Sequence, residues 1–552
     1  MNRLLWAVLI TVLLCAGQSL AQETSIAGRV VASGGNFPIV NARVVARGAG
    51  IAASVRVATT DEDGKFQLTN LSPGNYVIRA GAAGYITEPS LAATPATFYR
   101  PGENITIRMI KGGIITGRVL NKNGEPMALA RVRSVRVKDE EGNSVREGAT
   151  GRDWTTDDRG MYRLYGLEPG AYVVSASFTN VFRPAPSQTR QGSEAAPTYY
   201  PSSTLDGATL VNVSAGNETG GIDIRYRAER SYAVRGAVTG QAAQSGPQPG
   251  RTAISVTLSH AGTGVSVGST TIIPATGNNV FNFEGVADGV YELTAQTASG
   301  TSDAAIALPQ RVSVHGASVT DIVLTLTPMG SIAGRVLLDT SEPPEACRGA
   351  KTALVQETLI VARREVAAVK QPPSLASLLP VEAKPGSGGE FLLTNMNAGR
   401  YVLDVRPPSR LWFVRDLVWE NAESTPAKSP LNGVTLKLGE RAQGLKINLA
   451  LGAASIAGNV SSEKADARLR VYLVPSEKEH ENNALRYAET PVQVDGTFSM
   501  SNLAPGRYWL LVREADAAIT RAVLRREASK ANVEVMLQLC QRVVNQTLRF
   551  MP

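Results

Sequence analysis

The chain has 552 residues, of which 43% are hydrophobic and 19% charged, with a formal net charge of +8. This length is too great for one hydrophobic core, and the composition, with 52 Gly and 30 Pro, excludes a disordered or predominantly helical chain. A turn-rich β protein of about three to five domains is therefore expected. The basic residues are spread along the chain among acidic ones, which does not indicate a nucleic-acid partner.

The first predicted element is a signal peptide at residues 1–21. It has a basic start at Arg3, an apolar run from Leu4 to Leu14, and small residues at Ser19 and Ala21 that fit a cleavage site. The apolar run is too short to span a bilayer, and no later stretch is long and apolar enough to be a transmembrane segment. We expect cleavage before Gln22 and export to the periplasm, the cell surface or the medium.

A repeat then marks the rest of the chain. Counting from the Gly of a "DG" pair, an aromatic residue stands at +2, apolar residues at +4 and +7, Gly at +10, Tyr at +12 and an apolar residue at +14. The pattern starts at Gly64, Gly160, Asn279, Gly389 and Gly496, with Asn replacing the first Gly once. Its tyrosines are Tyr76, Tyr172, Tyr291, Tyr401 and Tyr508.

The spacing of this repeat has a physical meaning. Residues two apart point to the same side of a strand, so +2 with +4 and +12 with +14 indicate two strands facing a core. The segment between them, "NLSPG" in the first copy, is typical of a turn. A Tyr at the start of the second strand is what a tyrosine corner requires. The repeat therefore predicts a corner of a Greek-key sandwich, with a structural tyrosine.

Alternating strands flank each corner and set the boundaries of five expected β-sandwich modules. The opening strands include "SIAGRVV" at Ser25, and the closing strands run from "NITIRM" at Asn104 to "NVEVML" at Asn532. The modules, called modules 1 to 5 below, span residues 23–111, 112–229, 230–328, 329–452 and 453–552. Module 2 carries a long Pro-rich loop, and module 4 a long insertion.

The stretch "GRVVASGGNFPIVNARVVARG" followed by "TTDEDGKFQLTNLSPGNYVIRA" resembles the carboxypeptidase regulatory-like domain. The resemblance is clearest in modules 1 and 2, good in module 5 and weaker in modules 3 and 4. It implies a transthyretin-like, Ig-like sandwich, which is also grouped with carbohydrate-binding-like folds, in an exported bacterial tandem-repeat protein. In the namesake metallocarboxypeptidases this domain is a non-catalytic appendage.

Cysteine usage leaves two readings open. Cys15 falls within the signal peptide, where Leu14 before it does not fit a lipidation signal. Cys347 and Cys540 remain. In an oxidising compartment they can form a disulfide, or they can stay as two separate thiols.

Catalytic motifs are missing from the sequence. Of three histidines, His480 lies in "EKEHENN", where the acidic neighbours do not have the spacing of a zinc-carboxypeptidase site. No G-x-S-x-G elbow is present. We expect no enzyme activity, no cofactor and no metal, and histidines that lie at the surface.

Two aromatic pairs are candidates for ligand binding. Tyr199 and Tyr200 lie in the Pro-rich loop, while Trp412 and Trp419 lie in "SRLWFVRDLVWENA". Either pair could stack on sugar rings or pack against the edge of a sandwich. The leading hypothesis is a binding protein for a polysaccharide or an envelope protein. A structural spacer or scaffold array and an accessory chain of a peptidase are the alternatives, and the oligomeric state is not predicted.

Overall fold

The computed structural model describes most of the chain from Thr24 onward. The predicted signal peptide, most of the Pro-rich loop and most of the insertion in module 4 lie outside the described residues. The described residues are 24–49, 54–87, 98–145, 152–178, 196–227, 229–240, 253–273, 279–297, 304–339, 345–347, 353–365, 380–420, 430–461, 469–493, 495–514, 519–531 and 533–550.

Module 1 shows the plan of a two-layer sandwich. Its sheets have the strand orders β4-β1-β8-β6 and β3-β2-β5-β7, and β1 pairs with β8 in parallel and with β4 antiparallel. Buried and exposed side chains alternate along β1 and β8, so the inner faces of the two sheets enclose one apolar core. The strands are β1 (Ile26–Ala32), β2 (Arg43–Gly48), β3 (Val55–Thr59), β4 (Lys65–Leu68), β5 (Tyr76–Gly81), β6 (Tyr85–Thr87), β7 (Phe98–Tyr99) and β8 (Asn104–Lys111).

Module 2 repeats this plan. One sheet is ordered β12-β9-β16, with β17 also paired to β9, and the other β11-β10-β13-β14, with β15 also paired to β13. The elements are β9 (Gly113–Leu120), β10 (Arg131–Lys138), β11 (Arg152–Thr155), β12 (Met161–Leu167), β13 (Gly170–Ser177), β14 (Thr198–Tyr199), η1 (Leu205–Gly207), β15 (Val211–Val213), β16 (Glu218–Thr219) and β17 (Ile224–Arg225).

Module 3 differs because its two sheets are joined at one edge. The short strand β23 pairs with both β22 and β25, which makes one continuous path of strands, β20-β19-β22-β23-β25-β18-β21. The strands are β18 (Tyr232–Thr239), β19 (Ile254–His260), β20 (Ser266–Ile272), β21 (Val280–Val286), β22 (Gly289–Thr297), β23 (Ala305–Ala307), β24 (Gln310–Val314) and β25 (Val319–Pro328).

Module 4 returns to two separate sheets, β29-β26-β33-β31 and β28-β27-β30-β32. Its elements are β26 (Gly330–Leu338), η4 (Glu345–Cys347), η5 (Val355–Glu357), β27 (Leu359–Arg364), β28 (Val381–Ala383), β29 (Glu390–Met396), β30 (Gly399–Arg406), β31 (Trp412–Trp419), η7 (Pro430–Asn432), β32 (Val434–Leu436) and β33 (Arg441–Leu451).

Module 5 has the sheets β37-β34-β40 and β36-β35-β38-β39, with a helix outside the second sheet. Its elements are β34 (Ala454–Ser461), β35 (Leu469–Pro475), η8 (Lys478–His480), η9 (Ala484–Arg486), β36 (Ala488–Pro491), β37 (Thr497–Leu503), β38 (Gly506–Glu514), α3 (Arg521–Ala531), β39 (Glu534–Leu537) and β40 (Arg542–Arg549). The predicted all-β class built from sandwich modules is confirmed, and each module has its own apolar core.

The prediction of the closing strand of module 5 is wrong. The segment "NVEVML" at Asn532 contains β39, which pairs with β38 in the second sheet. The strand that runs parallel to the opening strand β34 is β40. Both segments alternate, so the pattern alone could not assign them to different sheets.

Each repeated corner carries the chain from one sheet to the other. In module 1 it joins β4 to β5, and its Gly74 has a φ of 147°, which favours glycine. The carbonyl of Gly64 accepts the Val30 N–H at 2.8 Å, and the equivalent bond from the opening strand recurs in all five modules. The same crossing occurs at β12 to β13, β21 to β22, β29 to β30 and β37 to β38.

A second repeated glycine lies in the middle of each opening strand. A Cβ on Gly334 would lie 2.1 Å from the Leu445 carbonyl oxygen and 2.7 Å from the Phe391 ring. Close contacts with the parallel closing strand recur at Gly28, Gly117, Gly236 and Gly458. The missing side chain makes room for the neighbouring strand and, in modules 1, 3 and 4, for the corner's +2 aromatic ring.

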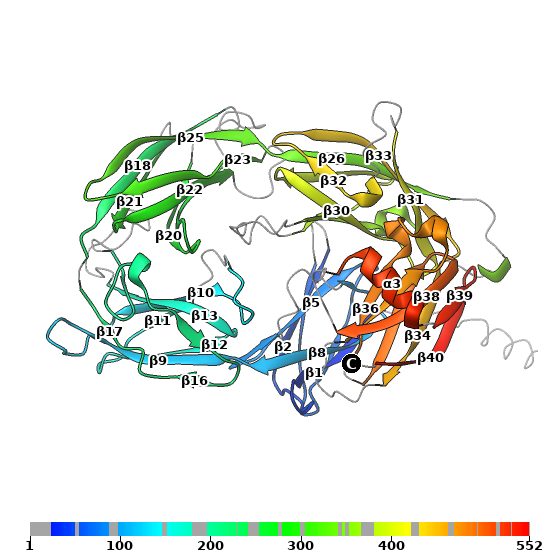
Figure 1. Ribbon diagram of the computed structural model, residues 1–552, viewed down its shortest axis with the longest axis horizontal. Coiled ribbons are helices and arrows are strands. Elements are labelled where there is room, and N and C mark those ends of the chain that lie inside the picture. The colour runs from blue at the N-terminus through cyan, green and yellow to red at the C-terminus, as the bar shows by residue number, and fades with distance from the viewer. Residues whose placement is uncertain are drawn as a thin grey trace, which may run out of the picture.

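Very short linkers join most consecutive modules. Gly112 alone separates β8 from β9, and Met329 alone separates β25 from β26. As Figure 1 shows, the chain follows a circuit through modules 1 to 4, and modules 4 and 5 then lie beside module 1. Hydrogen bonds from Arg100 to the Pro407 carbonyl (2.6 Å) and from Arg410 to Glu103 (3.0 Å) connect modules 1 and 4 directly. The array is therefore folded back on itself.

Candidate functional site

The five corner tyrosines make the same hydrogen bond in five separate places. Each hydroxyl donates to the backbone carbonyl four residues before it, at 2.7–2.9 Å. Each ring is buried in the core of its own module. Burial raises the pKa of Tyr291, Tyr401 and Tyr508, so these hydroxyls stay protonated donors. The five hydroxyls thus fix local turns and do not share a cleft.

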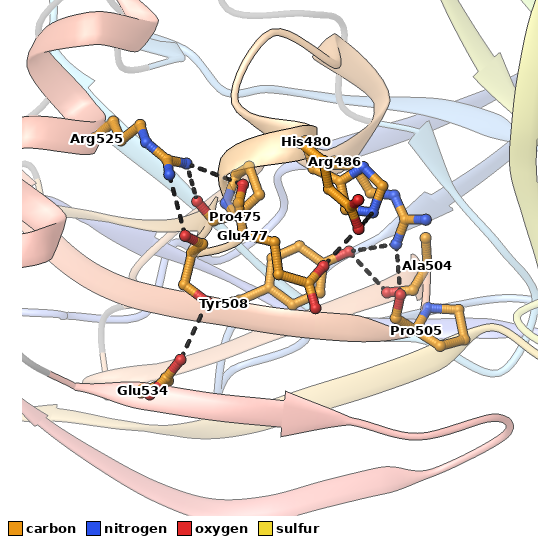
Figure 2. A network of polar contacts seen from close by, with 11 residues as sticks. Pro475, Glu477, His480, Arg486, Ala504, Pro505, Tyr508, Arg525 and Glu534 are labelled. Atoms are coloured by element: carbon orange, nitrogen blue, oxygen red, sulfur yellow. Dashed lines mark hydrogen bonds and ion pairs between the residues drawn. The ribbon is translucent and has the colours of Figure 1, made fainter.

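The corner of module 5 lies in a larger polar network, shown in Figure 2. Arg486 donates to the Pro505 carbonyl and to the Tyr508 hydroxyl. On the other side, Arg525 of α3 donates to the backbone carbonyls of Pro475 and Ser476 at 2.5 and 3.0 Å. These bonds dock the helix against the end of β35, where its Leu524 and Ala528 pack on Tyr472 and Val474.

The same network contains a cluster of three possible ligands for a cation. The Nε2 of His480 lies 3.5 Å from Glu477 and 3.6 Å from Glu479. Within the part of the chain that the structure describes, no other group of three His, Cys, Asp or Glu residues has this compactness. Glu479 is largely exposed, so the three side chains make polar contacts at the surface.

The four aromatic residues predicted to bind a ligand lie in three different environments. Trp412 is 7% exposed and belongs to the core of module 4, and Tyr199 is 8% exposed and packs where modules 2 and 3 meet. Since these two rings have almost no free face, we assign them to packing. Tyr200 and Trp419 are half-buried, each against the core of its own module.

Trp412 also ends a segment that is held from two sides. This segment, residues 407–412, is called the clasp segment below. Module 1 contacts it through Arg100 and Glu103, as described above. From module 5, the Asn502 side chain donates to the carbonyls of Ser409 and Trp412 at 2.6 and 2.7 Å. The clasp segment is thus the meeting point of modules 1, 4 and 5.

Cys347 and Cys540 form a disulfide in the structure. Their Cα atoms are 5.5 Å apart, and 193 positions separate them in the sequence. Cys347 ends η4 of module 4, while Cys540 lies between β39 and β40 of module 5. The bond therefore joins two modules covalently.

His260 contradicts the expectation that the histidines lie at the surface. It is 6% exposed and lies between modules 2 and 3. Its Nδ1 accepts the Thr263 N–H at 3.3 Å, so Nε2 carries the proton and donates to Asp206 of module 2 at 2.7 Å. Val265 of module 3 packs nearby into an apolar cluster of module 2. This histidine is a structural contact.

The structure brings together one exposed aromatic pair that the sequence analysis missed. Trp154 of β11 and Tyr165 of β12 are 42% and 38% exposed. Their ring centroids are 5.7 Å apart and their planes meet at 73°. The sequence holds one signal: at position +5 of the repeat, Tyr165 replaces the Thr, Glu or Ser of the other four copies.

Among the described residues, none of the helices has the length and apolar character needed to cross a membrane.

Comparison with known families agrees with the architecture of module 1. The family model of the carboxypeptidase regulatory-like domain matches residues 25–106. Module 1 is therefore similar to this family over that span. The matched regulatory-like domain covers both sheets of that module up to the first part of β8, including its corner. No curated protein matches the chain.

Several solved structures are similar to parts of the chain. A minor pilin of Streptococcus agalactiae is 16% identical, covers 37% of this chain and 94% of its own, and has a TM-score of 0.20. A shaft pilin of Lactobacillus rhamnosus GG is 13% identical, covers 37% of this chain and 97% of its own, and has a TM-score of 0.18. Two B repeat units of the collagen-binding protein of Staphylococcus aureus are 12% identical, cover 78% of this chain and 100% of their own, and have a TM-score of 0.14. At these scores the matches carry no argument about partners or activity.

Proposed function

We propose that the chain is an exported, non-catalytic binding protein of the cell envelope, whose sandwich modules present fixed surfaces to a polysaccharide or protein partner. The observation that carries this proposal is the clasp segment, where modules 1 and 5 hold module 4. A surface fixed before binding loses less conformational freedom when its partner binds, and binding residues on rigid sandwiches are a common arrangement.

The disulfide between Cys347 and Cys540 supports the exported location. Structural disulfides form and persist in oxidising compartments and are rare in the cytosol. The proposed signal peptide at residues 1–21 would deliver the chain to such a compartment.

The folded-back arrangement supports a binding role over an extended spacer. A spacer gains reach when its modules lie in a row, whereas here the contacts from Arg100 and Arg410 return module 4 to module 1. The half-buried Tyr200 and Trp419 remain proposed contact residues at the module surfaces.

A pull-down with the mature chain from Gln22 tests the proposal. The chain is immobilised and offered a panel of soluble polysaccharides and, separately, envelope proteins of the source cells. Saturable binding to one member is the expected result, with no turnover of peptide or ester substrates. Absence of saturable binding in both panels, with the chain folded, would favour the scaffold alternative, and turnover would contradict the non-catalytic assignment.

A further inference from the structure

The exposed pair of Trp154 and Tyr165 lies at an unusual place in module 2. β11 ends one sheet and β12 ends the other, and no described strand pairs beyond either of them. The two rings therefore meet edge to face across the open side of the sandwich. Most large aromatic side chains of the described residues are buried, so an exposed pair of rings in contact calls for an explanation.

Several polar side chains lie next to the aromatic pair, on the outer face of the sheet that contains β12. Met161, Arg163 and Tyr165 alternate along β12 with buried residues, so all three point outward. Arg163 forms an ion pair with Glu218 of β16 at 3.3 Å. Thr116 of β9, which lies between these strands, donates to the other Glu218 oxygen at 3.0 Å. The face thus offers donors and an acceptor beside the rings.

Each charged side chain named around the pair faces a group of opposite sign. Arg163 faces Glu218, and Asp153 of β11 forms ion pairs with Arg131 and, at 3.7 Å, with Arg133. An acidic ligand would have to compete with these carboxylates for the guanidinium groups. A neutral ligand that both donates and accepts hydrogen bonds matches an Arg–Glu pair without that competition.

We propose that Trp154 and Tyr165, with Arg163 and Glu218, form a binding site for a neutral polysaccharide. The apolar C–H face of a sugar ring covers the exposed aromatic surface, and the sugar hydroxyls bond to the Arg163–Glu218 pair. The outer face of β12, β9 and β16 accommodates further sugar units of the same chain. This inference rests on the proposed function and names its ligand class and its site.

Binding of the mature, disulfide-bonded chain to soluble polysaccharides tests this site. The probes are hydroxyethylcellulose, laminarin, xylan and galactomannan, with alginate as an acidic member, measured by calorimetry at low and high salt. We expect saturable binding to at least one neutral member, with little change in affinity when salt is added, because no net charge drives it.

Variants of the two rings separate this site from the rest of the chain. Trp154→Ala and Tyr165→Ala should each weaken binding by about tenfold or more, as central aromatic contacts do. Tyr165→Phe keeps the ring and should bind within about twofold of the parent. Phe37→Ala in module 1 is the matched control, because Phe37 is an aromatic residue that is 70% exposed elsewhere. Thermal unfolding of each variant establishes that it is folded.

Four outcomes would overturn the site. Polysaccharide binding that survives Trp154→Ala would place the site elsewhere and leave the proposed function standing. Binding to alginate alone that is lost at high salt would show that charge attraction, and not stacking on the rings, drives binding. Failure to bind any polysaccharide while an envelope protein is captured would reject this ligand class, and failure of both would reject the proposed function as well.

Discussion

Module 4 is held on two sides by contacts of different kinds. Its junction with module 5 has a disulfide, two side-chain bonds from Asn502, and a backbone bond from Ala453 N–H to the Leu411 carbonyl at 2.8 Å. Its junction with module 1 has an apolar cluster that includes Phe98 and Leu359, together with bonds made by arginine. Modules 4 and 5 are consecutive in the chain, whereas modules 4 and 1 are not.

The difference shows which junction depends on side-chain chemistry alone. A covalent bond and a linker of Gly452 and Ala453 keep module 5 close to module 4 even when weaker contacts open. No such tether holds module 1 against module 4, so that contact persists only while its packing does. Arg100 shows the cost of this packing, because its burial lowers the pKa of its guanidinium to about 10.

The largest expected effect comes from removing the disulfide. Replacing Cys347 and Cys540 together by Ser should lower the unfolding free energy of the joined modules 4 and 5 by about 4 kcal/mol, since the bond closes a long loop. Guanidinium unfolding curves measure the change. A reductant should shift the parent curve and leave the curve of the double variant in place.

Loss of Phe98 should weaken the other junction. Phe98 is 9% exposed, packs with Leu359 and Val361, and lies 5.7 Å from the Arg406 guanidinium. Phe98→Ala should cost about 2–3 kcal/mol, by loss of buried area and of the ring–cation contact. Protease sensitivity between modules 3 and 4 should rise. Val55→Ala, which removes an exposed side chain of module 1, is the control and should change neither property.

High pH should loosen the junction between modules 2 and 3. Burial raises the pKa of Tyr199 from 10.0 to about 12, so the folded state holds this proton more tightly than the unfolded state. The contribution to stability is complete below pH 10 and is lost as the pH rises through about 12, to a total of about 3 kcal/mol. The free energy of unfolding, measured at several pH values between 10 and 12, should therefore fall as the pH rises. Tyr199→Phe should reduce the slope, and an unchanged slope would contradict the assignment.

The ion pair between Arg410 and Glu103 should contribute least. Arg410 is 57% exposed, and exposed pairs are usually worth less than about 1 kcal/mol. Arg410→Ala should therefore change stability by about 0.5 kcal/mol at low salt and by less at high salt. A loss several times larger would mean that this pair, and not Phe98, holds modules 1 and 4 together.

Repetition decided what could be predicted from the sequence. The corner recurs five times with a fixed local spacing, so its turn, its strands and its tyrosine could be inferred before any contact was known. The glycine of the opening strands is also repeated, but its role depends on a closing strand many residues away, such as Ile105 beside Gly28. The helix α3 was missed because its charged residues resemble a solvated stretch and only Leu524 and Ala528 are buried.

The junctions could not be predicted because each occurs once. Arg100 and Pro407 are 307 positions apart, and the sequence around each residue does not indicate a contact with the other. For the same reason the sequence left open whether Trp412 contacts sugar or packs against the sandwich, since only the fold shows that this last residue of the clasp segment is buried. Trp154 has no repeated counterpart, and its pairing with Tyr165 depends on two strands that end different sheets.

A cross-linking measurement between modules 1 and 4 tests the folded-back arrangement most directly. Glu103→Cys and Arg410→Cys together place two thiols where an ion pair now joins the modules, and the native disulfide stays intact. A short bismaleimide added to dilute protein should link these thiols within one chain in high yield, and Glu103→Cys with Arg118→Cys serves as the unlinked control. Equal and low yields in both variants would show that modules 1 and 4 do not touch.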